Sequence, residues 1–166
     1  MTSKRRQLGA PRVRRHSSSL ENRQKRVRLP LQELERFLAR IGRELKLGHD
    51  AMFVRFITDA EMLRLNHRFR NKPKTTDVLS FPSETRTRPK ALRRRTMELQ
   101  GSFLGDIAIS PVVAGRNAKA FGRSMSEEIC ILMLHGVLHL LGYDHETDRG
   151  EMERVEARLR RRLGLS

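Results

Sequence analysis

The sequence of 166 residues has no tryptophan and a single cysteine, and aromatic residues make up only 5% of it. One cysteine cannot form an internal disulfide, which fits a protein of a reducing compartment. Cys130 lies in an apolar stretch, so we interpret it as a core residue rather than a nucleophile. No apolar run approaches the roughly 20 residues of a membrane-spanning helix, and the N-terminus lacks the hydrophobic region of a signal peptide. These absences favour a cytoplasmic protein that does not work in a membrane.

Acidic residues are also scarce, with 19 against 35 lysines and arginines, which gives a formal charge of +16. A domain this basic is typical of nucleic-acid binders. A membrane surface or a generally arginine-rich proteome would explain the composition less specifically. Residues 1–16 are predicted to form a disordered basic arm that precedes a single domain at 17–166. A second basic stretch at 86–95 is either a solvated loop or an RNA-contacting flap.

Apolar residues recur at helical spacing in some stretches and alternate in others, with turn residues between them. Helices are predicted at 30–47, 58–69, 111–120 and 125–141, with a last helix beginning after His145. Strands are predicted at 51–57, 78–81 and 103–109, with a short edge strand within 17–29. Thr58 and Ser124 each open a capping box at a helix start. The pattern predicts an α/β or α+β domain in which a small mixed four-stranded sheet packs with about five helices.

Three histidines lie within eleven residues at His135, His139 and His145. The first two are four residues apart, so on a helix they project from one face. Gly142 can end that helix in the left-handed conformation, after which the chain can turn and bring His145 back. Three neutral imidazoles that converge in this way form an open zinc site, whose fourth position is left for water. The alternative is a buried helix whose histidines only hydrogen-bond to their neighbours.

The segment that carries the first two histidines is apolar on nearly all sides from Ile129 to Leu141. A helix with no polar face is buried in the centre of a fold. The pattern therefore predicts that the zinc site lies on a central buried helix, one of the most rigid elements of the domain.

Several sequence blocks resemble known motifs. The segment from His135 to His145, with Gly136, Gly142, Tyr143 and Asp144 in it, resembles the signature of the YbeY family of bacterial endoribonucleases. Three further blocks are similar to the family in the same order. They are Asn22–Gln24, Asn66 with Phe69 and Arg70 running into Thr76–Pro82, and Gly105-Asp106-Ile107 with Ile109. The resemblance covers about residues 17 to 164.

The resemblance implies a single-strand-specific, metal-dependent endoribonuclease that acts in 16S rRNA 3′-end maturation, rRNA processing and ribosome quality control. It implies one zinc ion per chain, held by His135, His139 and His145, with Arg70 and His139 as catalytic residues. RNA and the ribosome or its small-subunit proteins would be the partners. Arg70 suits this role because a guanidinium stays charged and binds phosphate in bidentate fashion. The sequence does not indicate an oligomeric state.

The spacing of the histidines is also that of metzincin proteases, which carry a glutamate after the first histidine as general base. Here that position is Gly136, which argues against a peptidase and leaves the base unassigned. Asp144 lies next to a ligand, whereas Asp77 and Asp106 lie at strand starts, where each can orient a histidine or cap a turn. The nucleophile is either water or the 2′-hydroxyl of the substrate.

A non-catalytic rRNA-binding assembly factor, in which zinc only stabilises the fold, would carry the same basic charge. Structural zinc sites are usually closed by four protein ligands, which argues against this alternative. Asp144 or an unplaced residue could be such a fourth ligand.

Overall fold

The computed structural model describes residues 19–83 and 102–166, so the predicted arm at 1–16 and the basic stretch at 86–95 lie outside the described residues. The elements in chain order are β1 (Leu20–Asn22), α1 (Leu31–Glu44), β2 (Met52–Phe56), α2 (Asp59–Arg70), β3 (Val78–Pro82), β4 (Gly105–Ile109), α3 (Pro111–Phe121), α4 (Met125–Leu140) and α5 (Glu151–Leu163). Each strand and helix predicted from the sequence pattern is therefore present among the described residues.

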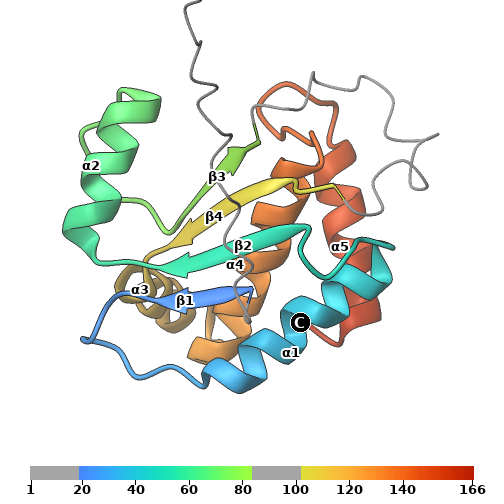
Figure 1. The fold of residues 1–166 in the computed structure, drawn as a ribbon, viewed down its shortest axis with the longest axis horizontal. Helices are drawn as coiled ribbons and strands as arrows, with labels where there is room; N and C mark the ends of the chain where they lie inside the picture. Colours follow the sequence, from blue (N-terminus) through green and yellow to red (C-terminus); the bar gives the residue numbers. More distant parts are fainter. Residues whose placement is uncertain (1–18, 84–101) are drawn as a thin grey trace, which may run out of the picture.

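The strands form one mixed sheet in the order β1-β2-β4-β3 (Figure 1). β1, β2 and β4 are parallel, whereas β3 is antiparallel to β4 and lies at the edge. Pro82 ends β3 at this edge, where a residue without an N–H is tolerated. The sheet and the five helices of residues 19–83 and 102–166 confirm the predicted fold class.

α4 packs against one face of the sheet (Figure 1) and contributes more residues to the main core than any other described element. Its apolar side chains are almost all buried, as the sequence predicts for a helix without a polar face. Alternate residues of β4, Ile107 and Ile109, point toward this core. α1, α3 and α5 each contact α4, so it is the central helix of the domain.

A smaller apolar cluster lies on the opposite face of the sheet, where α2 packs. Met62 of α2 is fully buried there against Leu79 of β3 and Ala108 of β4, with Phe81 at its border. The edge strand β3 therefore lies between α4, which is mostly buried, and α2, which is mostly exposed. α4 packs against one of its faces, and Met62 and Phe69 of α2 contact the other.

Two helix ends differ from the prediction. α1 ends at Glu44 rather than before Gly48, because Lys46 takes a positive φ of 55° and Leu47 N–H bonds to the Gly42 carbonyl. α5 begins at Glu151 rather than directly after His145. The carboxylate of Asp148 accepts from three backbone N–H groups at 150–152, so it caps the helix instead of lying within it.

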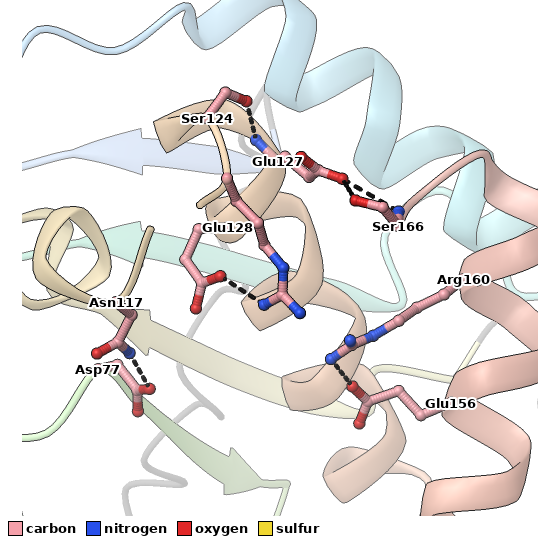
Figure 2. A network of polar contacts seen from close by, with 9 residues as sticks. Asp77, Asn117, Ser124, Glu127, Glu128, Glu156, Arg160 and Ser166 are labelled. Carbon is pink, nitrogen blue, oxygen red and sulfur yellow. Dashed lines mark hydrogen bonds and ion pairs between the residues drawn. The ribbon is translucent and has the colours of Figure 1, made fainter. Parts of the chain in front are cut away.

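The predicted start signals are otherwise confirmed. The Thr58 hydroxyl accepts from Glu61 N–H at 3.2 Å, and the Ser124 hydroxyl accepts from Glu127 N–H at 3.1 Å. Figure 2 shows the Ser124 contact at the start of α4. Among the described residues, no helix is both long and apolar enough to cross a membrane.

Candidate metal centre

His135, His139 and His145 come together at the C-terminal end of α4 and the turn that follows. One ring nitrogen from each lies within 4.8 Å of the others. The turn forms because Gly142 adopts a φ of 96°, as predicted, and Tyr143 N–H bonds back to the Leu138 carbonyl. Within residues 19–83 and 102–166, this is the one group of three potential metal ligands.

The two helical rings are oriented by acceptors at their Nδ1 atoms. Nδ1 of His135 lies 2.8 Å from a carboxylate oxygen of Glu156, and Nδ1 of His139 lies 2.9 Å from the carbonyl oxygen of Tyr143. An ionised carboxylate and a carbonyl can only accept, so each Nδ1 carries a proton and donates it. In the neutral ring, Nε2 is then left with its lone pair.

The Nε2 atoms of His135 and His139 lie 3.1 Å apart. Two lone pairs at this distance repel each other unless a proton or a cation lies between them. Two nitrogens held about 2.0–2.1 Å from a tetrahedral zinc ion stand about 3.3 Å apart, close to the observed separation. His145 is exposed, so its ring has room to complete the set. The donor set therefore fits zinc.

Burial lowers the pKa of His139, and the neighbouring rings of His135 and His145 add to the effect. The Tyr143 carbonyl acts in the opposite direction but does not reverse it. A lowered pKa keeps the imidazole neutral near pH 7, which is the form that binds metals.

Glu156 connects the centre to α5. Its side chain is 11% exposed and also pairs with Arg160 one turn later, a contact drawn in Figure 2. Burial opposes ionisation of Glu156, but the hydrogen bond from His135 and the Arg160 guanidinium together lower its pKa. The carboxylate therefore stays charged and keeps His135 in one tautomer.

Arg70 reaches the same region from the last residue of α2. Its Nη2 lies 3.9 Å from a carboxylate oxygen of Glu146, the residue after His145. Both side chains are about half exposed, so this ion pair is weak. A phosphate group could replace Glu146 as the partner of the guanidinium, because the existing pair is long and a phosphate can accept two of the guanidinium N–H groups.

The three candidate carboxylates have other contacts. Asp77 accepts from Val78 N–H at 2.8 Å and from the Asn117 amide at 2.9 Å, so it caps a turn and links β3 to α3 (Figure 2). Asp106 pairs with Arg55 across the sheet at 2.9 Å. Asp144 accepts from Glu146 N–H and Thr147, and the Glu146 bond chiefly lowers its pKa.

Gly136 lies against the sheet instead of facing the histidines. A Cβ at this position would meet Ile107 of β4 at 2.8 Å. The position that carries the general base in metzincins therefore has no room for a glutamate in this fold. Both the glycine at this position and its close contact with β4 therefore exclude the glutamate general base of a metzincin peptidase.

Cys130 packs against the core as the sequence indicates. Burial raises the pKa of its thiol to about 12. Little thiolate therefore forms near neutral pH, which supports the interpretation that Cys130 is not a nucleophile.

Sequence reasoning missed Glu156 and the Tyr143 carbonyl. Glu156 is separated from His135 by 21 residues, and the contact depends on how α5 packs against α4. No local spacing signals it. The turn after Gly142 could have suggested the Tyr143 carbonyl, because it brings the backbone under the second histidine.

The chain is similar to one protein family and to several known proteins. The family model described as Endoribonuclease YbeY matches residues 19–164. A protein named Endoribonuclease YbeY from Solibacter usitatus is 49% identical over 133 residues, 80% of this chain and 78% of that protein. A protein of the same name from Francisella tularensis is 32% identical over 141 residues, which are 83% of this chain and 80% of that protein. The solution structure of a Thermotoga maritima protein matches with a TM-score of 0.56 and 26% identity over 87% of both chains.

Proposed function

Because the chain belongs to the endoribonuclease YbeY family, we propose that it is a zinc-dependent endoribonuclease that cleaves single-stranded RNA. One zinc ion per chain would be held by His135, His139 and His145. The observation that carries the proposal is the 3.1 Å separation of two Nε2 atoms whose Nδ1 atoms are both engaged.

The proposed substrate is ribosomal RNA, with the 3′ end of 16S rRNA as the processed region. Ribosome quality control would use the same cleavage activity. The formal charge of +16 supports a polyanionic substrate. Ribosomes or small-subunit proteins are the proposed partners, and the cytoplasm, where they assemble, is the proposed site of action.

The chemistry follows from the residues at the site. Three neutral imidazoles add no charge of their own, and a bound zinc ion would supply Lewis acidity for a phosphodiester oxygen or a water molecule. Arg70 would bind the phosphate and stabilise the charge that develops on it. Two routes fit this arrangement: attack by the 2′-hydroxyl of the substrate, or attack by water with Asp144 as the proton acceptor.

Replacement of Arg70 by glutamate tests the role of the guanidinium. We expect Arg70→Glu to slow cleavage of a single-stranded oligoribonucleotide about 10²–10³-fold while zinc content is unchanged. Arg64→Glu is the matched control, because Arg64 is also exposed on α2 but lies further from its C-terminal end. A duplex of the same sequence should be cleaved poorly by the wild type.

A wild-type protein that binds zinc and RNA but cleaves neither single-stranded nor duplex RNA would favour the alternative of a non-catalytic assembly factor. Equal cleavage by Arg70→Glu and the wild type would remove Arg70 from the mechanism. A peptide or casein assay should be blank, and robust proteolysis would overturn the proposal as a whole.

A further inference from the structure

An aromatic ring is left in solvent near the end of α2. Phe69 is 58% exposed, although burial of a phenyl ring is favourable. The ring is nonetheless held in place. Phe81 of β3 meets it edge-to-face with centroids 5.2 Å apart, and the Arg68 guanidinium lies over it at 5.3 Å. The fold therefore presents a positioned aromatic surface to solvent.

Cationic residues flank Phe69 in the sequence. The residues from 67 to 74 are all exposed, and the stretch contains no acidic residue. Its charged members are Arg68, Arg70, Lys72 and Lys74. An aromatic ring among several cations matches the two parts of a nucleotide, because the base can stack while the phosphate pairs with a cation.

The exposed basic stretch at 67–74, called the basic turn below, is anchored by Asn66, which is only 2% exposed. Its side-chain amide donates to the Lys74 carbonyl at 2.7 Å, and its carbonyl accepts from Lys72 N–H. Asn71 reverses the chain with a φ of 53°. These contacts fix the turn before any ligand arrives, which reduces the entropy that binding would cost.

The sequence neighbours of both rings contact the histidine-bearing segment and the residue that follows it. Phe69 precedes Arg70, whose guanidinium approaches Glu146 beside His145. Phe81 follows Ser80, whose hydroxyl donates to the Gly136 carbonyl of α4 at 3.0 Å. Each ring is thus one residue from a contact with the segment that carries the proposed metal ligands.

We propose that Phe69, supported by Phe81, is a stacking subsite for a nucleobase of the single-stranded RNA whose phosphate lies at Arg70. The inference rests on the proposed function and adds the feature by which the protein distinguishes single-stranded from duplex RNA. A base in a single strand can leave its neighbours and stack on a side chain, whereas a paired base cannot do so without disrupting the duplex. The base would take the place of the Arg68 guanidinium, which can then move to a phosphate.

Binding of a labelled single-stranded oligoribonucleotide to the full-length chain tests this directly. Metal is removed with a chelator so that no cleavage occurs. We expect Phe69→Leu to weaken binding about tenfold, because the aromatic stacking surface is removed while apolar bulk remains. Phe69→Tyr should restore wild-type affinity, and affinity for a duplex should be the same in all these variants.

Phe121 provides the matched control at the end of α3. It is 65% exposed and lies under the Arg123 guanidinium at 5.0 Å, as Phe69 lies under Arg68. Arg123, however, is paired with Glu128 at 2.9 Å. Phe121→Leu should therefore leave RNA affinity unchanged, and a decrease equal to that of Phe69→Leu would mean a nonspecific apolar effect and would overturn the proposal.

The absence of tryptophan makes a second measurement possible. Phe69→Trp introduces a single tryptophan, whose fluorescence should be quenched when single-stranded RNA stacks on it. Phe121→Trp should show no quenching. An abasic site moved along the strand should weaken wild-type binding at one position and cause no further weakening in Phe69→Leu at that position, because the two changes remove the same interaction.

The outcomes separate this proposal from the proposed function. Wild-type cleavage of single-stranded RNA with unaltered binding by Phe69→Leu would overturn the stacking subsite and leave the nuclease intact. A wild type that neither binds nor cleaves RNA would overturn both. Weaker binding of duplex and single strand alike would also contradict the subsite, because stacking requires an unpaired base.

Discussion

At the scale of single residues, the candidate metal centre depends on more than the three histidines. The spacing of His135, His139 and His145 was enough to predict that they meet, because helical periodicity and a turn at Gly142 are local properties. The Tyr143 carbonyl that orients His139 is local too, but the orientation of the His135 ring is not. It depends on Glu156 of α5, which reaches His135 across the packing of two helices.

Glu156→Gln tests this orienting contact. We expect zinc affinity to fall about 10–100-fold, because the neutral amide holds the His135 tautomer less firmly than a carboxylate. Competition with a chelator of known affinity measures the change, and the visible spectrum of the cobalt-substituted protein reports the ligand geometry. Glu153→Gln is the control, since Glu153 is exposed on the same helix. Equal zinc affinity in Glu156→Gln and the wild type would show that Glu156 is only structural.

At the scale of elements, α4 and β4 approach closely because Gly136 has no side chain. The sequence pattern predicted the buried helix correctly, since its apolar residues cover every side. It predicted the ends of α1 and α5 less well. Those ends depend on single groups, the positive φ at Lys46 and the Asp148 carboxylate, which periodicity does not reveal.

Two glycine-to-alanine changes in helices should therefore have opposite effects on stability. At Gly136 the new methyl would overlap Ile107, and we expect a net decrease of about 1–2 kcal/mol in the free energy of unfolding. At Gly42 in α1 the nearest heavy atom is 3.9 Å away, and better helix propensity should add about 0.5–1 kcal/mol. Chemical denaturation of both variants measures the difference. Stabilisation by Gly136→Ala would mean that the helix and sheet are not packed as described.

At the scale of the whole molecule, the basic charge should act on RNA through counterion release. Residues 1–15 carry six lysines and arginines and no acid. Their deletion should reduce the salt dependence of single-stranded RNA binding, with the slope falling by about 0.7 for each phosphate that the arm no longer neutralises. Affinity measured from low to high salt gives this slope. Thermal unfolding should be unchanged, and an unaltered slope would show that the arm does not bind RNA.

The fold class and the histidine cluster were thus predictable from local patterns in this chain. The contacts that tune the site were not, because Glu156, Arg70 and Gly136 act through neighbours distant in the sequence. Asp77 and Asp106 illustrate the same limit, since their position at strand starts allowed two roles. The structure shows instead that Asp77 accepts a hydrogen bond from Asn117 and that Asp106 forms an ion pair with Arg55.

The most direct test of a zinc-dependent nuclease measures zinc content and single-stranded RNA cleavage together, on the wild type and on His139→Ala. We expect the wild type to hold about one zinc ion per chain and to cleave the strand. His139→Ala should retain the fold by circular dichroism and lose both zinc and cleavage. A folded His139→Ala protein that keeps its zinc and its activity would contradict the central claim.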